Sequence, residues 1–317
     1  MSELRTNWSV DEIEALYQLP FMDLLLQAQT THRQHFKANE IQIAHLLSIK
    51  TGACPEDCGY CSQSGHHSTS LKTEKLLPLD EVIEKAKAAK ASGSTRFCMG
   101  GAWRSPPKKA MGQLCDMIKA VNELGMESCL TAGMLDDEDV AELEAAGLRF
   151  YNHNLDTSPE YYDKVTKTRT YQDRLDTLER VRQSKISVCC GGILGLGEAH
   201  EDRASLLQQL ANQPEHPASV PINMLIAVPG TPMGNREPID ELEFVRTIAV
   251  ARILMPKSVI RLSAGRDKMS DSMQALCFMA GASSIFVGET LLTCGNPSVE
   301  KDQSLLQQLG IHAQVAA

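Results

Sequence analysis

After about residue 40, short runs of apolar and β-branched residues alternate with longer segments whose apolar residues recur every three to four positions. The short runs are typical of buried strands, and the longer segments are typical of amphipathic helices. The expected strands are Ile41–Ile49, Thr95–Met99, Glu127–Thr131, Leu148–Asn152, Ile186–Cys190, Val220–Leu225, Val259–Ser263 and Ser284–Val287. The expected helices between and after them are Leu79–Ala91, Lys109–Leu124, Asp137–Ala146, Tyr171–Gln183, Asp202–Ala211, Ile239–Leu254 and Ser272–Ala280.

This alternation predicts an α/β fold, a parallel (β/α)₈ barrel of the TIM type. A doubly wound open sheet is the alternative, and the even spacing and the number of strands favour the closed barrel. Amphipathic helices over Val10–Phe36 predict an N-terminal helical extension, residues 1–40. We expect the barrel over 41–297, and over 298–317 a C-terminal helix, Gln303–Leu309, followed by a flexible tail.

Composition narrows the classes of function. The net charge of −9 argues against a nucleic-acid partner, which needs a basic face on the protein. No apolar run approaches the length of a membrane span, and Met1–Arg5 lack the charged-then-apolar pattern of a signal peptide. We therefore expect a cytoplasmic protein without a membrane partner. Ten cysteines in that compartment indicate metal or redox chemistry rather than disulfides.

Three thiols, those of Cys54, Cys58 and Cys61, follow the first expected strand within one short loop. An iron–sulfur cluster normally takes four cysteine ligands. A local trio therefore leaves either a remote fourth cysteine or one iron open to a small molecule. Zinc is the alternative, but structural zinc sites favour paired Cys-x-x-Cys or Cys/His sets, and the loop has only His66 and His67 nearby. The spacing favours a cluster.

A barrel of this type builds its site from the carboxyl ends of its strands, where this chain places thiols and polar groups. Because residues two apart on a strand share a face, one lumen is expected to hold Cys98, Cys129, Cys189 and Arg261. The same alternation places Cys190 on the outer, apolar face, unless Gly191-Gly192 forms a bulge that reverses the two. If their segment stays extended, a polar ladder on one wall is formed by Asn152, Asn154 and Asp156.

The Cys-x-x-x-Cys-x-x-Cys spacing, with Tyr60 before the last cysteine, resembles the signature of the radical S-adenosylmethionine superfamily. Residues 48–58, 96–100, 151–157 and 261–266 together resemble the biotin synthase family, and the likeness runs from the N-terminal helix to about Pro297. The resemblance implies a homodimer that converts dethiobiotin to biotin as a radical sulfurtransferase, with an electron donor such as flavodoxin or ferredoxin.

The resemblance also implies a role for each motif residue. A 4Fe–4S cluster, whose open iron binds S-adenosylmethionine, would be held by Cys54, Cys58 and Cys61. A deeper 2Fe–2S cluster, the source of the sulfur, would be held by Cys98, Cys129, Cys189 and Arg261. Arginine stays protonated in proteins, so the role of Arg261 rests on the resemblance alone. The implied contacts to S-adenosylmethionine are Tyr60, Asn154, Asp156 and Arg174, and those to dethiobiotin are Asn152, Asn154, Asn223 and Thr293.

Two positions depart from the family pattern: Cys190 stands where a non-thiol is usual, and Cys294 stands where a second threonine is usual next to Thr293. Two other readings remain. Another radical S-adenosylmethionine enzyme of the same barrel class is one, although a lipoyl synthase would need a second local cysteine trio. A non-catalytic iron–sulfur carrier is the other, although a carrier has no use for the polar residues at 152, 154 and 156.

Overall fold

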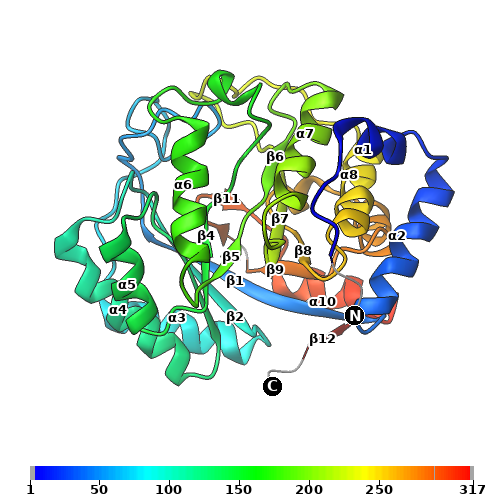
Figure 1. The fold of residues 1–317 in the computed structure, drawn as a ribbon. Helices are drawn as coiled ribbons and strands as arrows, with labels where there is room; N and C mark the ends of the chain where they lie inside the picture. The colour runs from blue at the N-terminus through cyan, green and yellow to red at the C-terminus, as the bar shows by residue number, and fades with distance from the viewer. Residues whose placement is uncertain (1–3, 289, 315–317) are drawn as a thin grey trace.

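The computed structural model describes residues 4–288 and 290–314, and its main sheet closes into a barrel (Figure 1). Neighbouring strands pair in parallel around the ring, and the last of them returns to the first. The ring consists of β1 (Glu40–Lys50), β2 (Arg96–Gly101), β3 (Glu127–Thr131), β4 (Phe150–Asn152), β5 (Ser187–Cys189), β7 (Ser219–Met224), β8 (Val259–Leu262) and β9 (Ser284–Val287). The predicted closed barrel is confirmed, and the open sheet is wrong.

One position of the barrel is filled by two short strands, because β6 (Gly192–Leu194) continues the path of β5 and pairs with the same neighbour, β7. Cys189 lies opposite Ser219, and Gly192 lies opposite Ile222, three residues further along both strands. The register is therefore the same on both sides of the break, and no bulge reverses Cys189 and Cys190. The break itself needs glycine, since a Cβ on Gly191 would lie 1.9 Å from the Pro221 carbonyl oxygen.

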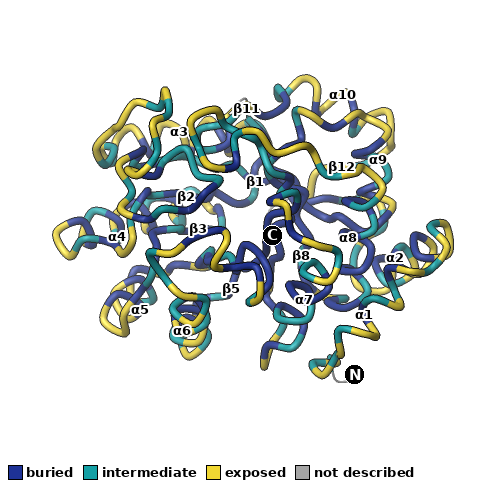
Figure 2. The backbone as a smooth tube through the Cα atoms, turned by 90° about the horizontal axis from the view of Figure 1, so that it is seen from above, coloured by how far each residue is buried: buried dark blue, intermediate teal, exposed yellow. Residues whose placement is uncertain are grey.

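Helices cover the outside of the barrel, with their exposed residues turned away from the buried strands (Figure 2). They are α3 (Leu79–Ala91), α4 (Lys108–Glu123), α5 (Asp137–Ala145), α6 (Tyr171–Arg182), α7 (His200–Ala211), α8 (Glu241–Leu254) and α9 (Asp271–Met279). Each agrees with its predicted segment to within two residues. Capping explains several starts: Asp136 and Thr170 each accept a hydrogen bond from the backbone three residues on.

The N-terminal extension forms two helices, α1 (Val10–Tyr17) and α2 (Phe21–His35), which lie against α7 and α8 (Figure 1). The Trp8 carbonyl accepts hydrogen bonds from the Gln208 and Asn212 side chains, at 3.0 and 2.8 Å. The Tyr17 hydroxyl donates to Thr247 Oγ1 at 3.0 Å. These contacts make the extension a brace on the outside of the barrel. Among the described residues no helix is long and apolar enough to cross a bilayer.

The carboxyl-terminal part of the chain differs most from the expectation. The last helix, α10 (Val299–Leu309), begins four residues earlier than predicted because Ser298 caps it. The predicted flexible tail is wrong at β12 (His312–Ala313), which pairs in parallel with the start of β1; residues 315–317 lie outside the described part. A hairpin of β10 (Thr290–Leu291) and β11 (Cys294–Gly295) was also not predicted. The domain boundaries stay a prediction.

The barrel has two apolar layers, one between its strands and the surrounding helices and one inside its lumen. Phe97, Met99 and Leu130 belong to the main core between strands and helices. Cys98 and Cys129 instead pack inside the barrel with Ala44, Phe286 and Leu291. The alternation of side chains predicted for β2 is therefore confirmed, and it places thiols in the lumen.

A buried ion pair fastens α10 to the barrel. Arg266, in a short 3₁₀ turn after β8, is fully buried, and its Nη1 donates to Asp302 at 3.2 Å and to the Phe286 carbonyl at 2.6 Å. We expect Asp302→Asn to lower the free energy of unfolding by about 3–5 kcal/mol, because the substitution leaves a buried charge uncompensated. Chemical denaturation measures this loss. The double variant Arg266→Met/Asp302→Leu should lose less; an equal or larger loss would contradict the explanation.

Candidate active site

A single cavity of about 320 Å³ occupies the lumen and the loops at the carboxyl ends of the strands. Every position of the barrel contributes a residue to its wall. All the predicted site residues line this cavity: Cys54, Cys58, Tyr60, Cys61, Cys98, Cys129, Asn152, Asn154, Asp156, Arg174, Cys189, Asn223, Arg261 and Thr293. The structure thus brings together side chains that lie up to 239 positions apart, between Cys54 and Thr293.

The first three thiols sit on a compact loop after β1. The Cys61 amide donates to the Cys58 carbonyl at 2.9 Å, and the Gly65 amide donates to the Cys54 carbonyl at 2.7 Å. Within the described residues, no three His, Cys, Asp or Glu side chains converge on a single metal ion. A cluster does not require such convergence, because its thiolates bind different irons. Three thiols on the wall of one cavity fit that arrangement.

The second set of thiols lies within the barrel, on β2, β3 and β5. Cys98 and Cys129 face each other across β2 and β3, and Cys189 lies opposite Asn152 across β4 and β5. The Asn152 amide donates to Cys189 Sγ at 3.3 Å. A hydrogen bond from Cys129, together with the charges of Arg261 and Arg96, lowers the pKa of Cys189 to about 5. The pocket therefore favours thiolate, the form of cysteine that binds metals, at Cys189. The pKa of Cys129 is raised instead, by its hydrogen bonds to Cys189 and Cys98.

The doublet Cys189-Cys190 is divided between the two faces as predicted. Cys189 lines the cavity, whereas Cys190 is fully buried in the main core with Ile186 and Val188. Burial raises the pKa of the Cys190 thiol. The pKa of Cys189 is thus lowered, whereas that of the adjacent Cys190 is raised.

Two buried arginines face the deeper thiols. Arg261 Nε donates to Ser284 Oγ and its Nη2 donates to Gln42 Oε1, each at 2.9 Å, so its partners are neutral. Sequence reasoning missed Arg96, which pairs with Glu127 at 2.9 Å and contributes to the lowered pKa of Cys98 and Cys189. Its position two residues before Cys98, and so on the same face of β2, could have predicted that its side chain enters the lumen.

The polar wall is built differently from the expected extended ladder. Asp156 has a left-handed φ of 68°, so the segment turns after β4. Its carboxylate forms a buried ion pair with Arg174 and accepts a hydrogen bond from the Tyr60 hydroxyl at 3.0 Å. Asn154 Oδ1 accepts from Asn152 Nδ2 and from the Gly191 amide, both at 3.1 Å. Arg174 Nη1 also donates to the Asn154 carbonyl at 2.6 Å, so the residues expected to contact S-adenosylmethionine are linked to one another.

The remaining predicted contacts come from β7 and from the β10–β11 hairpin. Asn223 Nδ2 donates to the Gly192 carbonyl at 3.0 Å, and Asn223 Oδ1 accepts from the Ala264 amide at 3.1 Å. Thr293 Oγ1 lies 2.8 Å from Ser62 Oγ on the cysteine loop. The neighbouring Cys294 also lines the cavity, so the departure from the family pattern lies at the site.

Two family models match the chain: "Radical SAM superfamily" over residues 48–210 and "Biotin and Thiamin Synthesis associated domain" over residues 221–312. A curated biotin synthase of Burkholderia ambifaria is 59% identical over 310 residues, covering 98% of this chain and 91% of the relative. A second, from Saccharophagus degradans, is 60% identical over 313 residues, covering 99% and 89%. The chain belongs to the biotin synthase family.

Solved structures agree on the fold. Methylornithine synthase (PylB) superposes with a TM-score of 0.82 at 18% identity, covering 96% of this chain and 94% of that one. The hydrogenase maturase HydG from Carboxydothermus hydrogenoformans gives 0.82 at 19% identity, covering 97% and 76%. As a biotin synthase family member with the radical SAM domain, the chain uses a 4Fe–4S cluster and S-adenosylmethionine. This decides against the zinc alternative for the cysteine loop.

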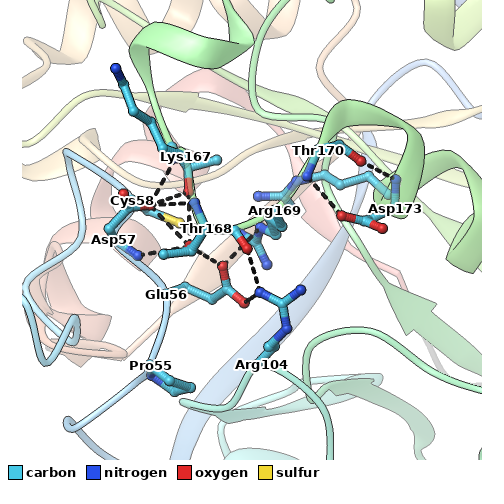
Figure 3. Close-up of polar contacts among 12 residues, drawn as sticks. Pro55, Glu56, Asp57, Cys58, Arg104, Lys167, Thr168, Arg169, Thr170 and Asp173 are labelled. Carbon is cyan, nitrogen blue, oxygen red and sulfur yellow. Dashed lines mark hydrogen bonds and ion pairs between the residues drawn. The ribbon is translucent and has the colours of Figure 1, made fainter.

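A second feature that sequence reasoning missed is the polar network around the cysteine loop of this biotin synthase family member (Figure 3). Glu56 is 2% exposed and accepts a hydrogen bond from Arg104 Nη1 at 2.8 Å. Arg169 Nη2 donates to Cys58 Sγ at 3.2 Å. The sequence could have indicated a role for Glu56, because it lies between two cysteines of the loop. No local pattern points to Arg169, which is 111 positions from Cys58.

Proposed function

We propose that the chain is a biotin synthase that inserts sulfur into dethiobiotin, with S-adenosylmethionine as the radical source. The observation that carries the proposal is the meeting of two sets of thiols, one on the loop and one in the lumen, on one cavity. A carrier needs its clusters alone, and the polar groups between the two sets support an enzyme.

The two thiol sets divide the cofactors between them. Cys54, Cys58 and Cys61 would hold the 4Fe–4S cluster. A 2Fe–2S cluster would be held by Cys98, Cys129, Cys189 and Arg261. When bound, the first supplies the electron that cleaves S-adenosylmethionine and the second supplies the sulfur atom, chemistry that side chains alone lack. The buried arginines favour thiolate at Cys189, and the closed barrel keeps water from the reacting groups.

Between the thiol sets, the polar wall would bind S-adenosylmethionine. Arg174 offers the planar fork of donors that suits a carboxylate, and it is already oriented by Asp156 and by the Tyr162 hydroxyl at 2.7 Å. Asn154 and Asp156 supply acceptors for ribose hydroxyls, and Tyr60 supplies a ring for the adenine. The existing ion pair keeps these groups in place before the ligand arrives.

Three amides, two of them on the polar wall and one on β7, would bind dethiobiotin. Asn152, Asn154 and Asn223 each offer both donors and acceptors, which match the N–H and C=O groups of a ureido ring. Thr293 would lie near the substrate carboxylate. With Cys294 beside it instead of threonine, we propose that Thr293 provides the side-chain hydroxyl at that end.

We expect Asn223→Ala to weaken dethiobiotin binding about 5- to 150-fold, the equivalent of about 1–3 kcal/mol for a buried polar group left without its partner. Binding of S-adenosylmethionine should change much less, because its proposed contacts lie on the cysteine loop, on the segment after β4 and on α6. Equilibrium binding of each ligand to the reconstituted protein measures both. An equal loss for the two ligands would contradict the proposed division.

The proposal is tested by anaerobic reconstitution with iron and sulfide, followed by incubation with reductant, S-adenosylmethionine and dethiobiotin. Mass spectrometry should detect both 5′-deoxyadenosine and biotin. Formation of 5′-deoxyadenosine without biotin would favour another radical S-adenosylmethionine enzyme. Formation of neither by a protein with intact clusters would favour an iron–sulfur carrier.

We further propose a homodimer, reduced in the cytoplasm by a one-electron donor such as flavodoxin or ferredoxin. The unpaired state of all ten cysteines supports a reducing compartment. Light scattering tests the dimer, and biotin formation with each purified donor in place of a chemical reductant tests the electron source.

A further inference from the structure

The segment before α6 is tied to the cysteine loop by two carboxylates (Figure 3). Asp57 accepts hydrogen bonds from Thr166 Oγ1 at 2.6 Å and from the amides of Lys167 and Thr168 at 2.9 and 3.1 Å. Glu56 accepts one from the Thr168 hydroxyl. Both acids lie between Cys54 and Cys58, so they fix the segment against the loop that carries the thiols.

This attachment brings a guanidinium to one of the three thiols. The side chain of Arg169 is only 8% exposed, its Nη2 donates to Cys58 Sγ at 3.2 Å, and its Nε lies 3.9 Å from the Glu56 carboxylate. That Nε is buried and has no hydrogen-bond partner among the residues that the structure describes. Burial of its side chain and the nearby Glu56 carboxylate thus hold the Arg169 guanidinium at the Cys58 sulfur.

We infer that Arg169 is a positioning residue that sets the reduction potential of the cluster at Cys54, Cys58 and Cys61. The inference rests on the proposed cluster and deepens it. Hydrogen bonds to the sulfurs and the charge around an iron–sulfur cluster tune its potential. Reduction adds negative charge to the cluster, and a cationic donor at Cys58 Sγ stabilises that charge. Arg169 therefore makes the cluster easier to reduce.

The experiment compares cluster potentials in reconstituted full-length protein without S-adenosylmethionine. We expect Arg169→Gln to reduce the equilibrium constant for one-electron reduction about tenfold, a shift of about 59 mV to lower potential. Arg169→Lys keeps the positive charge but loses the planar set of guanidinium donors. Its potential should therefore lie between those of Arg169→Gln and the wild type. The matched control is Arg180→Gln on α6, since Arg180 is 39% exposed and pairs with Asp137 on the outside. It should leave the potential unchanged.

Iron and sulfide content and the reduced-state EPR spectrum show whether each variant carries the cluster. If Arg169→Gln does not assemble the cluster, the test uses Arg169→Lys and Thr166→Val; the second removes the hydroxyl that donates to Asp57, so it loosens the segment without changing the charge and keeps the guanidinium. Each should lower the potential by a smaller amount, and wild-type potentials in both would overturn the inference. A wild-type potential in a loaded Arg169→Gln protein would overturn it directly. If the wild-type protein itself binds no cluster after reconstitution, the result would instead contradict the proposed function.

Discussion

Cys58→Ala should produce no 5′-deoxyadenosine above the level seen without reductant. Cys58 is one of three thiols on the loop after β1, and it is the thiol that accepts a hydrogen bond from Arg169. Iron–sulfur clusters need their cysteine ligands, and with only two left on the loop the electron source for cleavage of S-adenosylmethionine is lost. Cys54→Ala and Cys61→Ala should behave in the same way.

The measurement is anaerobic incubation of the reconstituted variant with reductant and S-adenosylmethionine, with chromatography of the nucleoside product. Cys115→Ala is the matched control, because Cys115 lies on α4 and does not line the cavity; its thiol donates a hydrogen bond to the Glu142 carbonyl, at 3.7 Å. The control should retain full cleavage. Wild-type product from Cys58→Ala would remove the assignment of the loop as the cluster site.

Cys189→Ser should lose or alter the 2Fe–2S spectrum and form no biotin, whereas Cys190→Ser should keep both. The two residues are adjacent, yet only Cys189 faces the cavity, where Asn152 donates to its sulfur and Cys129 lowers its pKa. Cys190 is 0% exposed in the apolar core. Burying a hydroxyl there should lower the free energy of unfolding by about 1–3 kcal/mol.

Absorption and EPR spectra of the two reconstituted variants, with biotin measured by mass spectrometry, separate these outcomes. Because each variant exchanges one sulfur for one oxygen at neighbouring positions, each serves as the control for the other. Reversed phenotypes would mean that the strand faces are exchanged in solution. Full biotin formation by both would place the second cluster elsewhere.

The barrel was predictable because local patterns and tertiary structure agree. Each strand of the ring and each helix around it lies within two residues of its predicted segment. The exceptions depend on distant partners. β6 exists because the chain resumes pairing with β7 beyond Gly191, and β12 exists because the start of β1 offers free backbone groups to a segment that is short and mostly polar. Neither partner is visible in a local sequence pattern.

The thiols of the site were predictable for a similar reason, since strand alternation alone assigns Cys98 and Cys189 to the lumen. The turn at Asp156 was not, because a non-glycine residue with a left-handed φ leaves no clear mark in the sequence. Arg169 was missed because its contact with Cys58 depends on how a loop after β4 folds back over a loop after β1. Such contacts between loops follow from the finished barrel.

The pairing of β1 with both β9 and β12 has a consequence for the order of events in the cell. A ribosome makes β1 first and these two strands last, so the ring has no closing partner until nearly the whole chain has emerged. Joining such distant segments also makes closure a late step in folding. Before then the thiols at 98, 129 and 189 have no enclosed space around them. For the 2Fe–2S cluster proposed at these thiols, iron and sulfide would therefore be enclosed only after β9 has been made and has joined β1.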